Sequence, residues 1–155
     1  MKLHQLRIER SLELPAQIDV LIQYSEREGF RFLNRLKQDF QSGTNCFDQI
    51  GEALFVVYDQ HDRLIAVGGL NQDPFAESQQ VGRLGRFYVH PDYRANQIGT
   101  HLLGHIEQYA KTYFERLDLF TDTAQAAQFY QSRGYQSIVS THRNFYKILS
   151  NGVLI

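Results

Sequence analysis

The sequence has little that would support a secreted, membrane-spanning or nucleic-acid-binding protein. Its 155 residues include one cysteine, so no internal disulfide can form, and this usage favours a reducing compartment. No apolar run approaches the roughly 20 residues that cross a bilayer, and charged residues interrupt the first 15, unlike a secretion signal. The net charge of −1 gives no general attraction to polyanions. We expect a cytoplasmic protein that binds neither membrane nor nucleic acid.

The chain does contain enough apolar bulk for a packed core. Hydrophobic residues make up 43% of it, with 11 Phe and 9 Tyr, so no disulfide or structural metal is needed for stability. The length fits a single domain that spans residues 1–155. The open edges of a short sheet would allow a homodimer, although no residue specifies one.

Hydrophobic spacing predicts a mixed α/β (α+β) fold. Apolar residues at helical spacing indicate two short helices between Leu14 and Gly43, and a second helix pattern, the clearest in the chain, begins at Ile98. Two apolar runs separated by polar residues indicate a β-hairpin. In chain order we expect a strand (3–8), two helices (14–43), three strands (53–58, 64–70 and 81–89), a helix (98–113), a strand (117–120), a helix (124–133) and one or two strands (135–149).

The turn before the clearest helix is the best candidate for a binding site. The strand at 81–89 passes through a short loop directly into the helix that begins at Ile98. The first N–H groups of a helix lack internal partners, and its dipole places partial positive charge there, which suits a phosphate. Arg86 and Arg94 bring cations nearby, and Gly99 allows close approach to the backbone. These features predict a site for a diphosphate ligand.

Two motifs in this region carry a resemblance to a known family. The chain reads V-H-P-x-Y-R-x-x-x-I-G-x-x-L-L from Val89 to Leu103, and A-x-x-F-Y-x-x-x-G-Y from Ala126 to Tyr135. The first resembles the acetyl-CoA-binding signature of the GNAT acetyltransferases. The second resembles a helix motif that follows at this distance in the same family. Together with the order of elements, the resemblance covers nearly the whole chain.

The resemblance implies a fold, a reaction and a binding site. The fold would be a mixed central sheet that splays after its fourth strand and is flanked by helices, with acetyl-CoA in the wedge. The reaction would be direct transfer of an acetyl group from CoA to a primary amine of a small molecule or peptide, without a metal. Pantetheine would pair with the backbone of residues 87–89, and the pyrophosphate would lie on residues 97–100. The implied CoA-binding residues are Phe87, Tyr88, Val89, Arg94, Ala95, Asn96, Gln97, Ile98, Gly99 and Thr100.

Two residues are candidates for proton transfer. Tyr130 matches the general acid of the family, and a phenol and a thiol have pKa values within about 2 units of each other, so the transfer is nearly balanced. The incoming ammonium also needs a base or a water relay. By strand topology, Glu52 and Asn71 should lie toward the acceptor side, and Glu77 is a further carboxylate in a nearby loop. Of these, Glu52 is the preferred base.

Other features leave a second function open. Gln97 stands where the family has its first glycine, and we expect a helical backbone there that still presents its N–H. This departure and the lack of an obvious base leave open the alternative of a non-catalytic acyl-CoA-binding or regulatory module, whereas Tyr130 favours the enzyme. His101 and His105 have the i, i+4 spacing of zinc ligands, but no third ligand is apparent, so we expect no metal site.

Overall fold

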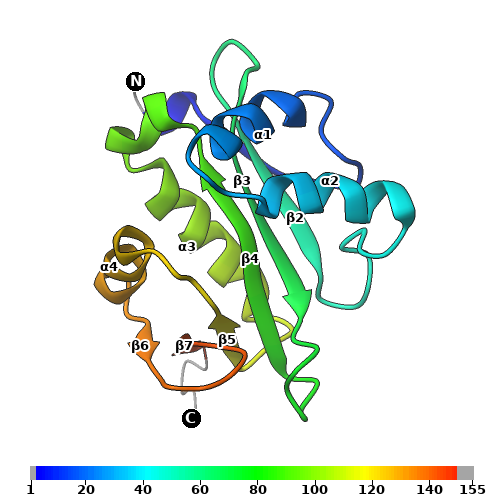
Figure 1. Ribbon diagram of the computed structural model, residues 1–155, viewed down its shortest axis with the longest axis vertical. Coiled ribbons are helices and arrows are strands. Elements are labelled where there is room, and N and C mark those ends of the chain that lie inside the picture. Colours follow the sequence, from blue (N-terminus) through cyan, green and yellow to red (C-terminus); the bar gives the residue numbers. More distant parts are fainter. Residues whose placement is uncertain (1–2, 150–155) are drawn as a thin grey trace.

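The computed structural model describes residues 3–149, which form one mixed, open sheet flanked by helices (Figure 1). Over this range the sheet has seven strands in the order β1-β2-β3-β4-β5-β7-β6. The strands are β1 (Arg7–Ser11), β2 (Ala53–Tyr58), β3 (Leu64–Gln72), β4 (Val81–Val89), β5 (Arg116–Leu119), β6 (Gln136–Ser137) and β7 (Phe145–Ile148). The expected mixed α/β fold is confirmed.

Helices cover both faces of the sheet. Alternate residues of β2 divide between two hydrophobic cores, since successive side chains of a strand point to opposite faces. One core holds α1 (Ile18–Arg27) and α2 (Phe32–Ser42), and the other holds α3 (Ile98–Ala110), as Figure 1 shows. Helix α4 (Ala124–Ser132) packs near the start of α3 through Phe129, which lies 3.5 Å from where a Cβ on Gly99 would be. The buried stripe of α3 is Ile98, Leu102, Leu103, Ile106 and Ala110.

The sheet opens between β4 and β5. These two strands run parallel and pair only from Val81 to Arg83, opposite residues 116–118. Beyond Arg83, β4 continues to pair with β3 as far as Val89 on its other side. The register of that pair shifts near Arg86, whose φ of 53° marks a β-bulge. The described part of the chain therefore has no strand beside residues 84–89 on the β5 side.

Most of the elements expected from the sequence are confirmed, with one clear error. The first strand is present but lies later than the expected 3–8: Leu3–Gln5 is a 3-10 turn, and β1 starts at Arg7, opposite Tyr58 of β2. This edge strand is largely polar and exposed, so pairing with β2 sets its limits rather than its own apolar pattern. Helix α2 ends at Gly43, which adopts a left-handed φ of 80°. No helix among residues 3–149 is long and apolar enough to cross a membrane.

Candidate active site

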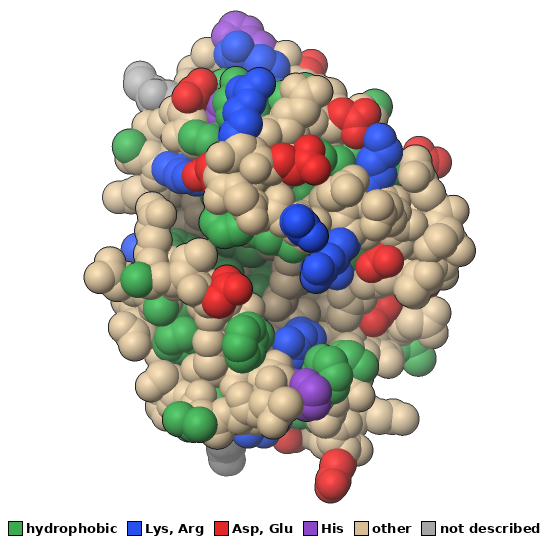
Figure 2. Space-filling model, in the orientation of Figure 1, with side chains coloured by type: hydrophobic (Ala, Val, Ile, Leu, Met, Phe, Trp, Pro, Cys, Tyr) green, Lys and Arg blue, Asp and Glu red, His purple; other side chains and the backbone are tan. Residues whose placement is uncertain are grey.

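A cavity of about 660 Å³ occupies the opening between β4 and β5. Figure 2 shows it as a hollow with a hydrophobic floor and Lys or Arg side chains along part of its rim. Its walls come from four places in the chain: residues 83–89 of β4, the turn into α3, the segment from the end of β5 into α4, and the loop between α1 and α2. The motifs found in the sequence thus meet at one cavity.

The N-terminus of α3 forms one end of this cavity. A 3-10 turn at Pro91–Asn96 leads to Gln97, and the first hydrogen bond of the helix runs from the His101 N–H to the Gln97 carbonyl. The preceding N–H groups, at residues 98–100, have no partner within the helix. Gln97 has φ 60° and ψ 21°, so the helical conformation expected there is wrong. Its backbone is left-handed, the region in which glycine is the least strained residue.

Most of the residues expected to bind CoA line the cavity. Asn96 and Ile98 are not among the lining residues, and the side chain of Ile98 is fully buried in the α3 core. The structure brings the other eight together around one space: Phe87, Tyr88, Val89, Arg94, Ala95, Gln97, Gly99 and Thr100.

Arg94 is already paired within the protein. Its two terminal nitrogens each donate to a carboxylate oxygen of Glu28 at 2.7 Å, and its Nε donates to the Val89 carbonyl at 3.1 Å. The Tyr88 hydroxyl also donates to Glu28. The hydrogen bond from Arg94 is the main cause that lowers the pKa of Glu28, and burial is the main cause that raises the pKa of Tyr88. An incoming phosphate would meet an Arg94 whose charge is partly neutralised.

Tyr130 projects from α4 against the same cavity. Its ring packs against Phe129 and Tyr135, with centroids 5.2 and 5.4 Å away, and against Phe87 at 6.2 Å. Its hydroxyl forms no hydrogen bond with any residue from 3 to 149, and it is not enclosed by protein atoms. Burial of the ring raises the pKa of Tyr130 above its ordinary 10.0, so the phenol stays protonated at neutral pH. The group is placed to donate a hydrogen bond to a molecule in the cavity.

Glu52 lies outside the cavity. Its two carboxylate oxygens accept hydrogen bonds from the backbone N–H groups of Gln49 and Gln72, at 3.1 and 3.0 Å. The side chain thus connects the loop before β2 to the end of β3, and the structure does not bring it together with Tyr130. Asn71 is likewise occupied, through a reciprocal pair of hydrogen bonds with Asn45. Glu77 is exposed and is not a lining residue.

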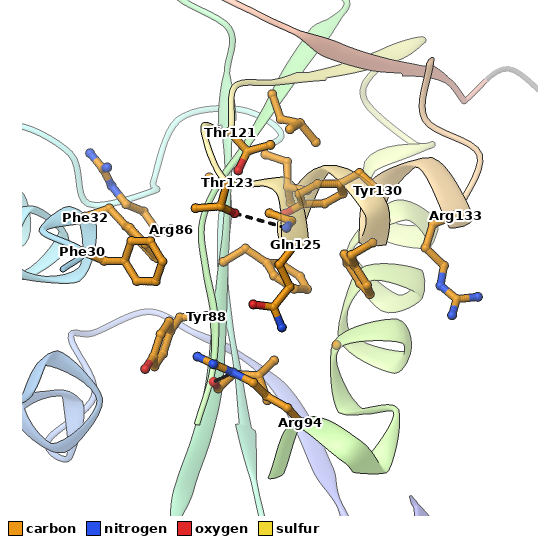
Figure 3. Close-up of a pocket in the computed structure, with 18 of the residues that line it drawn as sticks. Phe30, Phe32, Arg86, Tyr88, Arg94, Thr121, Thr123, Gln125, Tyr130 and Arg133 are labelled. Carbon is orange, nitrogen blue, oxygen red and sulfur yellow. Dashed lines mark hydrogen bonds between the residues drawn. The ribbon is translucent and has the colours of Figure 1, made fainter. Parts of the chain in front are cut away.

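Two further walls of the cavity were not expected from the sequence. Phe30 and Phe32, in and just after the α1–α2 loop, lie on one side of β4, while Gln125 projects from α4 on the other side (Figure 3). The α1–α2 loop is more than 50 residues from the motif at residues 89–103, and no spacing relates the two. The start of α4 does have a local signal, because the Thr123 hydroxyl accepts from the Ala126 N–H at 3.2 Å and caps the helix.

Comparison with protein families gives one match, to the acetyltransferase (GNAT) family, over residues 18–135. A search of the curated proteins found no match. Solved structures do match. A protein from Exiguobacterium sp. 255-15 with a provisional acetyltransferase assignment has a TM-score of 0.83 and 28% identity, covering 92% of this chain and 93% of its own.

Two more distant structures share the fold. An acetyltransferase of the GNAT family from Staphylococcus aureus Mu50 has a TM-score of 0.69 and 16% identity, over 94% of this chain and 99% of its own. A tyrosine-to-phenylalanine mutant of the AtaT toxin, solved with the C-terminus of the antitoxin AtaR and acetyl-CoA, has a TM-score of 0.70 and 13% identity, over 94% of each chain. The family match spans most of the chain and includes both motifs that line the cavity, and the chain therefore belongs to the GNAT acetyltransferase family.

Proposed function

We propose that this GNAT protein is a single-domain, acetyl-CoA-dependent N-acetyltransferase that transfers an acetyl group to a primary amine of a small molecule or peptide. One observation carries the proposal. A single cavity joins the open edge of β4, the N-terminus of α3 and a tyrosine hydroxyl that has no protein partner in the described chain. The single cysteine favours action in the reducing cytoplasm.

The lining residues fit the parts of acetyl-CoA, which supplies the acetyl group as a thioester. The unpaired edge of residues 87–89 offers backbone donors and acceptors to the amide groups of pantetheine. The N–H groups at residues 98–100, with the helix dipole behind them, would hold the pyrophosphate. Arg94 would add a cation once phosphate oxygens compete with Glu28 for its guanidinium.

Tyr130 is proposed as the general acid. The amine nitrogen forms a bond to the thioester carbon, the carbon–sulfur bond breaks, and its electron pair goes to sulfur. The Tyr130 hydroxyl then gives its proton to this thiolate, and the phenolate recovers a proton from the acylated nitrogen or from water. Burial raises the pKa of the phenol, and a thiolate formed in the same apolar surroundings would also have a raised pKa, so the transfer stays near balance.

The proton of the incoming ammonium goes to water in this proposal. The carboxylates that line the cavity, among the residues described, are Glu28 and Asp122. Glu28 is held by Arg94 and Tyr88, and Asp122 is exposed at the rim. Glu52, preferred on sequence grounds, is bound to two backbone N–H groups elsewhere. The acidic limb of the pH–rate profile should therefore follow the pKa of the acceptor amine.

None of the described lining residues is a buried carboxylate that is free to act as a base. This also favours the alternative function, a non-catalytic acyl-CoA-binding module. Release of CoA from acetyl-CoA in the presence of a panel of primary amines separates the two. An N-acetyltransferase releases CoA and forms the acetylated amine in equal amounts. Binding of acetyl-CoA without amine-dependent release would overturn the enzyme and support the module.

Tyr130→Phe tests the role of the hydroxyl. We expect turnover to fall by about 100-fold or more, while the affinity for acetyl-CoA changes little. Tyr135→Phe is the matched control, because it also removes a hydroxyl from a buried tyrosine, one that donates to Glu107 at 2.7 Å rather than facing the cavity. Equal turnover for Tyr130→Phe and the wild type would exclude Tyr130 as the acid.

A further inference from the structure

Four arginines line the cavity, and three of them are hydrogen-bonded to the protein or exposed to solvent. Arg94 is paired with Glu28 as described above. Arg83 donates from one terminal nitrogen to the backbone carbonyl of His142 at 2.7 Å, and its other terminal nitrogen is buried 3.8 Å from a carboxylate oxygen of Asp73, without a hydrogen bond to any described residue. Arg133, at the end of α4, is exposed to solvent. The fourth, Arg86, makes no hydrogen bond with a described residue and has one carboxylate, on Asp39, at ion-pair distance.

The guanidinium of Arg86 is largely shielded from bulk solvent, yet it has few partners in the protein. Its side chain is only 28% exposed, its nearest carboxylate oxygen, on Asp39, is 3.7 Å away, and it makes no hydrogen bond with any residue in the described range, so its N–H donors are left to the solvent of the cavity. A guanidinium has five N–H donors in a planar fork. Burial is the main cause that lowers the pKa of Arg86, with Asp39 opposing it and the positive charges of Arg35 and Arg83 adding to it. An anion beside Arg86 would offset both the cost of burying its charge and the repulsion from Arg35 and Arg83.

Arg86 lies apart from Arg94, in the part of the cavity that the cofactor would leave open, and not beside the diphosphate as its place in the sequence suggests. It is on the β4 bulge, and Figure 3 shows it on the same side of β4 as Phe30 and Phe32, away from Tyr130 and the rest of α4. The rings of Phe30 and Phe32 lie 5.6 Å apart and give this end an apolar wall. An acceptor that reaches Tyr130 from this side would pass both the aromatic wall and the guanidinium.

We propose that the acceptor is a small amine that carries a carboxylate and an apolar body, of the amino-acid type, and that Arg86 binds the carboxylate. This inference rests on the proposed N-acetyltransferase function. A planar carboxylate matches the fork of a guanidinium with two parallel hydrogen bonds. A phosphate of two negative charges is less suited, because Asp39 lies beside the same group. Arg86 is thus proposed as the residue that determines acceptor specificity.

The test compares matched acceptors. Leucine, leucinamide and isoamylamine, and likewise phenylalanine, phenylalaninamide and phenethylamine, differ mainly in the carboxylate. Each kcat/KM is divided by the fraction of unprotonated amine at the assay pH, and O-phosphoethanolamine serves as the phosphate probe. We expect the wild type to favour the carboxylates over their amides by about 10- to 100-fold, as for a hydrogen bond to a charged group.

Variants assign this preference to Arg86. Arg86→Gln should remove it through a higher KM for the amino acids, with the kcat/KM for isoamylamine and the affinity for acetyl-CoA unchanged. Arg86→Lys keeps the charge without the fork and should restore part of the preference. Arg35→Gln, which removes a nearby cation that does not line the cavity, is the control and should keep it.

The outcomes separate this inference from the proposed function. Amide or uncharged amine acceptors used as well as the amino acids would overturn the inference and leave the acetyltransferase intact. A preference for O-phosphoethanolamine would overturn it in the same way. A preference that survives Arg86→Gln would exclude Arg86. No acetylation of any amine would overturn both, and the wild-type acceptor ratio decides the substrate class even where the variant does not fold.

Discussion

Replacement of Gln97 by glycine should stabilise the protein. Gln97 is the residue before α3 and adopts φ 60° and ψ 21°, where the Cβ of an L-residue crowds the following carbonyl oxygen. Its side chain makes no hydrogen bond or ion pair with a residue between 3 and 149, so little is lost when it is removed. Glycine adopts the same backbone conformation without the Cβ.

The expected gain is the difference between two terms. The left-handed conformation costs an L-residue about 1–2 kcal/mol. Glycine has greater freedom in the unfolded chain, which costs about 0.4–1 kcal/mol on folding. The free energy of unfolding of Gln97→Gly should therefore rise by about 0.5–1 kcal/mol, which raises the Tm of a chain of this size by about 1–4 °C.

Urea denaturation of the wild type, Gln97→Gly and Gln97→Ala measures this backbone strain. Gln97→Ala removes the same side-chain atoms but keeps the Cβ, so its midpoint should lie at or below that of the wild type, whereas the midpoint of Gln97→Gly should lie above it. Acetyl-CoA should bind to Gln97→Gly at least as tightly as to the wild type, because the N–H groups at 98–100 are unchanged. A glycine variant less stable than the alanine variant would refute the argument from backbone strain.

Four further results are expected. Tyr130→Phe should leave the free energy of unfolding within about 0.5 kcal/mol of wild type, because its hydroxyl has no protein partner in the described chain; a larger loss would show an unrecognised hydrogen bond. Asp59→Asn should lower the free energy of unfolding by about 2 kcal/mol at neutral pH. Burial opposes the charge of Asp59, but hydrogen bonds from two backbone N–H groups and two side chains hold its pKa at about 2 instead of 3.8. The stability that the ionised Asp59 contributes is therefore present above pH 3.8 and lost as the pH falls toward 2. Stability should also fall above about pH 10, by about 1.4 kcal/mol per pH unit for each tyrosine, since burial raises the pKa values of Tyr130 and Tyr135 above their unfolded value; Tyr135→Phe should reduce the slope in a pH series of denaturation curves. Glu28→Gln should tighten acetyl-CoA binding several-fold by calorimetry, because it releases Arg94 from its ion pair; weaker binding would indicate that Glu28 orients Arg94 rather than competes for it.

The sequence predicts the elements whose patterns are local. The stripe from Ile98 to Ala110 has a 3.6-residue period that only a helix satisfies, and the apolar runs of β2 and β3 flank a polar turn. The first strand was misplaced because β1 is polar and owes its position to pairing with residues 54–58, far along the chain. Its limits depend on tertiary contacts that no local pattern contains.

The candidate site also has parts that the sequence predicts and parts that it does not. The motifs around Gln97 and Tyr130 are contiguous, and the sequence places both at one cavity in agreement with the structure. The helix begins at Ile98 as expected, but the left-handed backbone of Gln97 just before it is not predicted, because hydrophobic spacing carries no information on the backbone of a single residue outside the helix. Strand topology places Glu52 beside the end of β3, where it accepts hydrogen bonds from Gln49 and Gln72, but it does not predict that the side chain lies outside the cavity, because that depends on its direction.

A crystal structure of the protein with CoA tests the proposed binding site most directly. We predict pantetheine along residues 87–89, pyrophosphate oxygens within hydrogen-bond distance of the N–H groups at 98–100, and the sulfur beside the Tyr130 hydroxyl. CoA bound outside the opening between β4 and β5, or with its sulfur away from Tyr130, would contradict this prediction.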